Sequence, residues 1–270
     1  MIPQPAVVLS PHLDDAVLSC WHLLDGPGEV TVVNVFTGSP RAGTPTPPWD
    51  RATGARDPVS RMRERREEDR QALRVVGRRA VGLGLLDQQY RRSPVQPARL
   101  AELLDGHVPP GAVVHAPAGL SGHPDHVAVR AAAMQLARLG RPLVLYADLP
   151  HGTTRGWPAW VSGTPEADGL DVGAEWERVL DDAGLLVPRL VPRVRAVDER
   201  ARERKLRALG EYRTQRPGLD AMSFVPLDDP RALAFEVAWQ VPPSALRGAD
   251  EARGQLGVAD TVGQALHHRR

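Results

Sequence analysis

The first 150 residues alternate short runs rich in β-branched residues with longer segments of helical periodicity. The candidate strands are residues 6–10, 29–36, 79–86, 112–116 and 142–147, and the candidate helices between them are residues 14–24, 60–76, 94–104 and 124–139. This alternation is typical of βαβ units, which need a parallel sheet with helices on both of its faces. We therefore predict an α/β, Rossmann-like fold with a mostly parallel sheet.

The alternation weakens after residue 171. A helix over residues 172–183, a strand over 189–197, a strongly charged helix over 198–212 and a strand over 233–239 either extend the sheet or form a cap. A hydrophobic content of 42% in 270 residues is enough to fill a sizeable core, so the fold does not need cross-links such as disulfide bonds. We predict a single domain over residues 1–245 and a C-terminal tail over 246–270, whose flexibility is left open.

Composition excludes several classes of protein. A net charge of +1 gives no global field that would recruit nucleic acid. The only cysteine, Cys20, rules out an intramolecular disulfide and an all-cysteine zinc site. The first residues lack the basic start and long apolar run of a signal peptide, and no segment approaches the roughly 20 apolar residues that span a bilayer. We expect a cytoplasmic protein without a membrane span, and a homo-oligomer is left open.

The first strand ends in a cluster of polar residues, Ser-Pro-His-Leu-Asp-Asp, over residues 10–15. In doubly wound folds, ligands bind outside the carboxyl ends of the strands, which is where this cluster falls. His12 and Asp15 are three residues apart, so a turn that enters a helix can bring both side chains to one metal ion, while Asp14 points elsewhere. The alternative is that Asp14 or Asp15 caps the helix and that His12 has only a structural role.

A second cluster, Gly-His-Pro-Asp-His over residues 122–126, follows the strand at 112–116 and begins an alanine-rich helix. Pro124 suits the first helical turn and leaves His123 and His126 about one turn apart. Capping and dipole compensation are the alternative, although histidine is usually favoured at the other end of a helix. Two such clusters, each behind a predicted strand, are hard to explain by capping alone.

Together the two clusters contain the ligands of a hydrolytic zinc site. Such sites take three protein ligands from histidine and carboxylate and keep a fourth position for water. His12, Asp15 and His126 supply these three. Asp14 can accept the proton of the attacking water, and His123 can either donate to the developing oxyanion or protonate the departing amine.

These two motifs, in this order and about 110 residues apart, resemble the LmbE-like, or PIG-L, N-acetylglucosaminyl deacetylase family. The resemblance implies a Rossmann-like fold and one divalent metal per chain, usually Zn²⁺. It also implies His12, Asp15 and His126 as ligands, Asp14 as general base and His123 as the charged partner of the tetrahedral intermediate.

Two looser matches and several departures accompany this resemblance. Residues 65–68, Arg-Arg-Glu-Glu, are similar to the family's Arg-x-x-Glu helix, in which Arg65 would reach substrate, and residues 212–215, Tyr-Arg-Thr-Gln, are similar to its Tyr-x-Ser-Gln signature. Asp87 falls where some relatives contact the sugar. Leu13 and Ala16 replace a proline and a glutamate of the first motif, and Ser121 stands where the thiol-cofactor branch has a tyrosine.

Competing functions lack their motifs. The turn after the first strand holds no Gly-x-Gly-x-x-Gly for a dinucleotide, and residues 119–123 break the Gly-x-Ser-x-Gly of a serine hydrolase at its last position. A non-catalytic metal- or sugar-binding protein is a rival interpretation, but binding alone does not require Asp14 and His123.

We therefore predict a zinc-dependent hydrolase that removes an N-acetyl or other N-acyl group from a small amino sugar or glycoconjugate. An amidase of thiol conjugates or an antibiotic-tailoring deacetylase is the runner-up.

Other residues near predicted strand ends have two interpretations. His115 and His151 follow strands, but a lone histidine is more often structural, and neither belongs to the predicted ligand set. The loops at 38–59 and 151–170 lie where a pocket rim would be, or are variable surface loops. Trp157 and Trp160 in the second loop either stack on a sugar or, as we favour, pack the loop.

Overall fold

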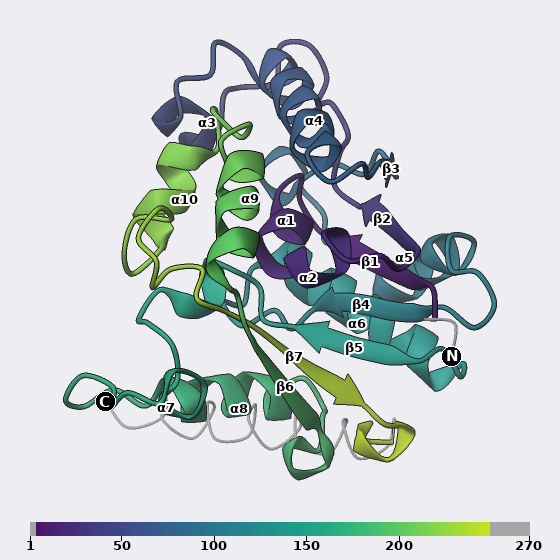
Figure 1. The fold of residues 1–270 in the computed structure, drawn as a ribbon. Coiled ribbons are helices and arrows are strands. Elements are labelled where there is room, and N and C mark those ends of the chain that lie inside the picture. The colour runs from purple at the N-terminus through teal and green to yellow at the C-terminus, as the bar shows by residue number, and fades with distance from the viewer. Residues whose placement is uncertain (1–3, 249–270) are drawn as a thin grey trace, which may run out of the picture.

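A computed structural model describes residues 4–248 (Figure 1). Within this range the chain forms a seven-stranded sheet in the order β3-β2-β1-β4-β5-β7-β6. The strands are β1 (Ala6–Ser10), β2 (Val30–Asn34), β3 (Ala80–Gly82), β4 (Val113–Pro117), β5 (Leu143–Tyr146), β6 (Val191–Ala196) and β7 (Phe235–Val241). The first five run parallel, whereas β7 and β6 add an antiparallel edge. The predicted α/β fold with a mostly parallel sheet is confirmed.

Strand β1 lies between β2 and β4 and is buried along its whole length. A strand with a neighbour on each side and helices on both faces meets no water, which explains why its sequence is a continuous apolar run. The strand order runs from β1 towards β2 and β3 on one side and towards β4 and β5 on the other. Ligands of doubly wound sheets bind where this direction reverses, at the carboxyl ends of the strands. The loops after β1 and β4, which contain the two motifs, meet at this point.

Two groups of helices cover the two faces of the sheet (Figure 1). Right-handed crossovers place helices on opposite faces when the strand order advances in opposite directions. On one face lie α1 (Asp15–Ser19), α2 (Trp21–Leu24), α4 (Pro58–Arg74) and α9 (Glu199–Leu209), and on the other α5 (Pro97–Asp105) packs against α6 (Pro124–Arg138). The remaining helices are α3 (Pro48–Ala52), α7 (Ala159–Ser162), α8 (Val172–Asp182) and α10 (Arg216–Met222).

The prediction of one continuous helix over residues 14–24 is wrong, because the helix is interrupted at Cys20. The backbone N–H groups of Trp21 and His22 donate to the buried carboxylate of Glu236 on β7, at 2.6 and 2.9 Å. In a continuous helix these two groups would bond to carbonyls four residues earlier. A buried carboxylate is costly without hydrogen bonds, and this demand divides the helix.

The sequence leaves open whether the segments after residue 171 extend the sheet or form a cap, and the structure decides between the two. The segments predicted as strands at 189–197 and 233–239 form β6 and β7, which extend the sheet, and the charged segment between them forms α9. The strand predicted over 79–86 is shorter, because only Ala80–Gly82 pairs with β2 and the chain turns at Gly84, whose φ of 72° is left-handed.

No helix within residues 4–248 is long and apolar enough to cross a membrane. The single sheet extends from residue 6 to residue 241, and the one domain expected over 1–245 stays a prediction. Most of the tail expected over 246–270, residues 249–270, lies outside the described residues.

Candidate active site

The loop after β1 is shaped by its own hydrogen bonds. Ser10 Oγ donates to the carbonyl of His12 at 2.7 Å and accepts from the N–H of Ala16 at 3.0 Å. The carboxylate of Asp15 accepts the N–H of His12 at 2.7 Å. These bonds lead the chain directly from β1 into α1 and keep the side chains of His12 and Asp15 together.

The loop after β4 is fixed where it enters α6. Pro124 occupies the first helical turn, and the ring of His123 caps the helix by accepting the N–H of Asp125 at 3.2 Å. His126 follows one residue later and is fully buried. Its ring therefore points from the start of α6 towards the loop after β1.

The three predicted ligands meet in a compact triangle. His12 Nδ1 lies 3.5 Å from Asp15 Oδ2, His126 Nε2 lies 3.5 Å from the same oxygen, and the two nitrogens are 3.3 Å apart. A tetrahedral ion with bonds of about 2.1 Å holds its ligand atoms about 3.4 Å apart. The donor types and their spacing thus fit Zn²⁺ or a similar divalent metal.

The other ring nitrogen of each ligand histidine contacts a buried carboxylate. His12 Nε2 lies 3.0 Å from Asp125 Oδ2, and His126 Nδ1 lies 3.0 Å from Asp148 Oδ2. A carboxylate in this position holds the proton on the ring nitrogen that it contacts, and the other ring nitrogen, which faces the triangle, is then free to bind metal. Sequence reasoning did not assign this role to Asp125 or Asp148. The sequence positions of both residues nevertheless pointed to the site, since Asp125 lies inside the second motif and Asp148 follows β5 closely.

The electrostatics of the triangle favour a cation. Burial opposes the charged form of each group, but Asp125 and Asp15 raise the pKa of His12, and Asp15 and Asp148 raise the pKa of His126. In turn, His126 and His12 hold the pKa of Asp15 well below its usual range. Carboxylates that attract protons to the two rings also attract a metal, which binds in place of those protons.

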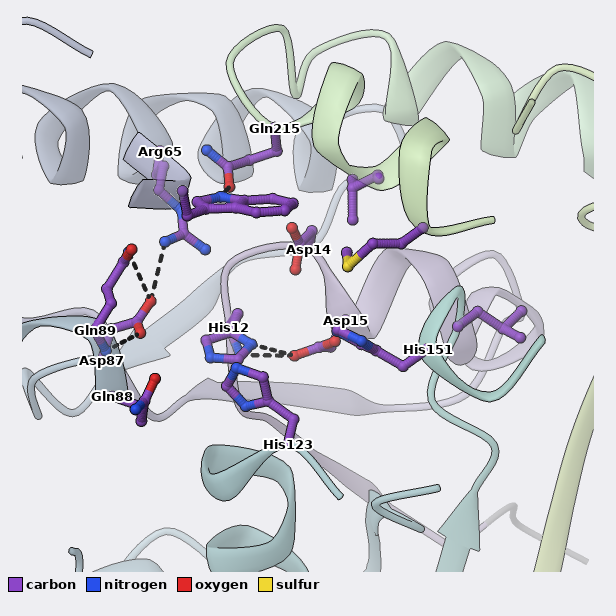
Figure 2. A pocket seen from close by; sticks show the side chains of 14 residues that line it. His12, Asp14, Asp15, Arg65, Asp87, Gln88, Gln89, His123, His151 and Gln215 are labelled. Carbon is purple, nitrogen blue, oxygen red and sulfur yellow. Dashed lines mark hydrogen bonds and ion pairs between the residues drawn. The ribbon is translucent and has the colours of Figure 1, made fainter. Parts of the chain in front are cut away.

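Three further titratable groups face the same space as the triangle (Figure 2). Burial and the charge of Asp15 raise the pKa of Asp14 to about 6. Burial, together with the ligand histidines, lowers the pKa of His123 and of His151 to about 4. A carboxylate and two imidazoles beside a metal site are groups that can accept a proton and donate hydrogen bonds to a reacting carbonyl.

The two predicted substrate-binding residues lie together at one side of this space. Arg65 on α4 donates to Asp87 Oδ2 at 3.2 Å, and Gln89 reaches the same oxygen at 3.4 Å (Figure 2). The guanidinium is buried, and its Nε has no hydrogen-bond partner among the described residues. This side is therefore polar and retains a free donor.

The predicted site residues other than His126 line one cavity with a volume of about 180 Å³. Its lining consists of His12, Asp14, Asp15, Trp49, Arg65, Asp87, Gln88, Gln89, His123, Leu149, His151, Gln215, Leu219 and Met222. Trp49, Leu149, Leu219 and Met222 give the cavity an apolar wall. The structure thus brings all seven predicted site residues to one place, with His126 directly behind the others.

The two looser sequence motifs pack against each other behind the cavity. Glu68 accepts hydrogen bonds from the N–H and the hydroxyl of Thr214, at 2.8 and 2.7 Å. Asp69 accepts the hydroxyl of Tyr212 at 2.9 Å, and burial raises the pKa of Asp69 to about 7. These bonds connect α4 to the segment before α10, so that Arg65 and Gln215 reach the cavity from two sides.

The remaining histidine and loop residues differ in whether they line the cavity. His115 is buried away from the cavity, whereas His151 lines it. The loop at 38–59 reaches the cavity through Trp49. Trp157 and Trp160 pack in an aromatic cluster with Trp176 and do not line the cavity. Trp157 is buried, as the favoured packing role requires, whereas Trp160 is 45% exposed and its role stays a prediction.

Comparison with known proteins shows the family to which this doubly wound chain belongs. A family model described as GlcNAc-PI de-N-acetylase, PIG-L, matches residues 7–137. The solved structure of the A40926 pseudoaglycone deacetylase is 31% identical, with a TM-score of 0.65, and the match covers 90% of this chain and 99% of that one. The chain belongs to the PIG-L (LmbE-like) family, as its motifs predicted.

Two further proteins that are similar to this chain are also named as deacetylases. The 2'-N-acetylparomamine deacetylase of Streptomyces fradiae is 33% identical over 200 residues, which are 67% of this chain and 64% of that enzyme. The chain thus spans slightly less than two thirds of this curated relative. A zinc-inhibited form of teicoplanin deacetylase is 23% identical, with a TM-score of 0.63 over 88% of this chain and 98% of that one, and this similarity shows the fold alone.

Proposed function

We propose that this protein is a metal-dependent deacetylase that removes an N-acetyl group from an amino sugar carried by an antibiotic-like glycoside. Among the functions considered from the sequence, the relatives favour antibiotic tailoring, which was part of the runner-up, over general amino-sugar deacetylation. The paromamine and A40926 enzymes are named for such substrates. A thiol-conjugate amidase gains no support, because Ser121 at the place of the tyrosine is exposed.

The observation that carries this proposal is the ligand triangle with Asp14 beside it. His12 Nδ1, Asp15 Oδ2 and His126 Nε2 are mutually 3.3–3.5 Å apart, and Asp14 lines the same cavity. A protein that only bound metal or sugar would have no use for a buried free carboxylate at this position. Asp14 is 6% exposed, and burying a carboxylate costs stability, a cost that is typical of residues at functional sites.

The reaction requires one water and leaves two products. A divalent metal held by His12, Asp15 and His126, with Zn²⁺ as the first candidate, would lower the pKa of water and polarise the amide carbonyl. Asp14 accepts one proton as the water oxygen bonds to the carbonyl carbon, and the carbon–nitrogen bond then breaks. The proton held by Asp14 moves to the departing nitrogen, which yields acetate and a free amine.

The cavity can hold an amino sugar in one orientation. Arg65, Asp87 and Gln89 offer donors and acceptors for sugar hydroxyls on one side of the ligand triangle. The apolar wall that includes Trp49 and Leu219 can contact an apolar sugar face or aglycone. The cytoplasmic location and the oligomeric state remain predictions.

The proposal is tested by metal content and acetate release. The purified protein is stripped of metal, reloaded separately with zinc, cobalt, manganese or nickel, and incubated with N-acetylated aminoglycosides, glycopeptide aglycones and N-acetylglucosamine. We expect one metal per chain and metal-dependent release of acetate. Zinc is compared with the other metals because one relative is described in a zinc-inhibited form.

Two variants separate the two parts of the site. Asp14→Asn should keep the metal and lose activity about 10²- to 10⁴-fold, the range for a general base. His126→Ala should lose both metal and activity. Full activity of Asp14→Asn would refute the assignment of the base, and a wild-type protein that binds no metal would refute the proposal as a whole.

A further inference from the structure

His151 lines the cavity but is absent from both sequence motifs. Resting on the proposed function, we propose that its imidazole donates a hydrogen bond to the substrate carbonyl oxygen as negative charge develops there. His151 would thus supply, from the loop after β5, a donor that Ser121 does not provide. The ring keeps its proton throughout, so the step transfers no atom.

The position of His151 brings it close to the reacting centre. Its ring centroid lies 4.9 Å from that of the ligand His126 and 5.7 Å from that of His123. In Figure 2, His151 approaches from beside Asp15, across the ligand triangle from the polar side with Arg65 and Asp87. A sugar held on that polar side would direct its amide nitrogen away from His151 and leave the carbonyl end nearer to it.

The ring is free to bind a ligand. Neither nitrogen of His151 makes a hydrogen bond with another residue in the described part of the chain, 4–248, although the ring faces the cavity. In His123 one ring nitrogen is already used, because Nδ1 accepts the N–H of Asp125 and only Nε2 is left to donate, and Arg65 already pairs with Asp87. A partly buried imidazole without a hydrogen-bond partner, aimed at the proposed metal site, is suited to donate to a ligand.

The backbone around His151 holds the ring in place. The 3-10 turn His151–Thr153 begins beside Asp148, whose carbonyl accepts the N–H of Gly152 at 2.8 Å. The indole of Trp176 donates to the carbonyl of Gly152 at 2.9 Å. A Cβ at Gly152 would lie 2.8 Å from the side chain of Leu120, so a larger residue there would require that side chain to shift. Because Asp148 also contacts His126, the turn and the metal ligand share one anchor.

The test compares His151→Ala, His151→Gln and the control Thr154→Ala, whose exposed side chain lies just after the same turn. Loss of one oxyanion donor lowers kcat by about 10²- to 10³-fold, so we expect His151→Ala to fall in this range with little change in KM. His151→Gln retains an N–H donor and should recover part of the loss. All three variants should keep one metal per chain and the wild-type Tm.

A second measurement does not depend on turnover. The cobalt-loaded protein is titrated with acetate, whose carboxylate imitates the charged oxygen, and the visible spectrum reports binding. We expect the Kd for acetate to rise about tenfold in His151→Ala, the equivalent of one hydrogen bond, and less in His151→Gln. Thr154→Ala should match the wild type.

The outcomes separate this inference from the proposed function. A wild-type protein that releases no acetate but binds cobalt and acetate would refute the proposed substrate, while the change in acetate affinity would still decide the role of His151. Wild-type kcat and acetate affinity in His151→Ala would overturn the inference. Loss of metal from His151→Ala would also overturn it, because His151 would then be a ligand.

Discussion

At the scale of single residues, the proposed site depends on which nitrogen of each predicted ligand histidine carries the proton. Asp148 accepts from His126 Nδ1 and, through its other oxygen, from the N–H of Leu120 at 3.1 Å. Being buried and ionised, it can only accept, so the proton must stay on Nδ1. This leaves the lone pair of Nε2 pointing at Asp15 and His12, where the metal is proposed to bind.

Asp148→Asn should therefore weaken metal binding without removing a ligand. The amide can donate its N–H to Nδ1 of His126, which would move the ring proton to Nε2, the nitrogen needed for the metal. We expect the affinity for zinc to fall about 10- to 100-fold, measured by competition with a chromogenic chelator. Asp182→Asn on the exposed end of α8 is the control. Unchanged zinc affinity would mean that Asp148 does not set the tautomer.

At the scale of elements, helix α10 builds one wall of the cavity. Gln215, Leu219 and Met222 are spaced at i, i+4 and i+7, so they lie on one face of the helix and all line the cavity. Trp49 packs against this helix at Gly218, where an added Cβ would lie 2.2 Å from the indole. The glycine thus allows α3 and α10 to meet.

Gly218→Ala should displace the indole and damage the wall. Alanine is favoured over glycine in a helix by roughly 0.5–1 kcal/mol, so the helix itself should not lose stability through propensity. We expect KM for the N-acetylated substrate to rise about fivefold, the equivalent of about 1 kcal/mol of lost apolar contact, with kcat nearly unchanged. Steady-state kinetics on Gly218→Ala and on the exposed control Ala221→Gly decide this. Equal KM values would show that the indole does not contact substrate.

At the scale of the whole molecule, one buried cluster connects the C-terminal part of the sheet to the start of helix α2. Lys205 on α9, the only lysine in the chain, pairs with Glu236 on β7 at 3.0 Å and is fully buried. The same carboxylate accepts from the backbone N–H groups of Trp21 and His22. Helix α2, which follows α1 and Asp15 directly, is therefore held by Glu236, a residue more than 200 positions away.

Glu236→Gln should destabilise the protein by about 3–5 kcal/mol, because it leaves Lys205 buried without a partner. A urea unfolding curve measures the loss, and Glu199→Gln on the exposed start of α9 is the control. Replacing Lys205 by methionine in the same variant should recover part of the stability, since no unpaired charge remains. A loss below about 1 kcal/mol in Glu236→Gln would contradict the importance of this cluster.

The carboxyl group of Glu236 should also make the free energy of unfolding depend on pH. Burial opposes its ionisation, but Lys205 and His22 lower the pKa of Glu236 from its ordinary 4.5 to about 2. A depressed folded pKa stabilises the protein above the unfolded pKa, and this contribution, about 3 kcal/mol, is lost as the pH falls from about 4.5 to about 2. The free energy of unfolding of the wild type should thus fall more steeply over this range than that of Glu236→Gln. Parallel curves would contradict the shift.

The sequence alone determined the fold class and the identity of the proposed ligands. Apolar runs such as residues 6–10 need no distant partner to be identified as buried strands, because continuous burial leaves a continuous apolar pattern. His12, Asp15 and His126 lie in two short motifs whose local turns largely position them. Such features follow from interactions between near neighbours in the chain.

Only the tertiary structure decided the features that depend on distant partners. The break at Cys20 comes from Glu236, and the tautomers of the two ligand histidines come from Asp125 and Asp148, which lie 113 and 22 residues away from them. His151 reads as a lone histidine in the sequence, and only the packing of its turn places it beside His126. A local pattern contains no information on which distant groups meet across the sheet, because that depends on how the whole chain packs.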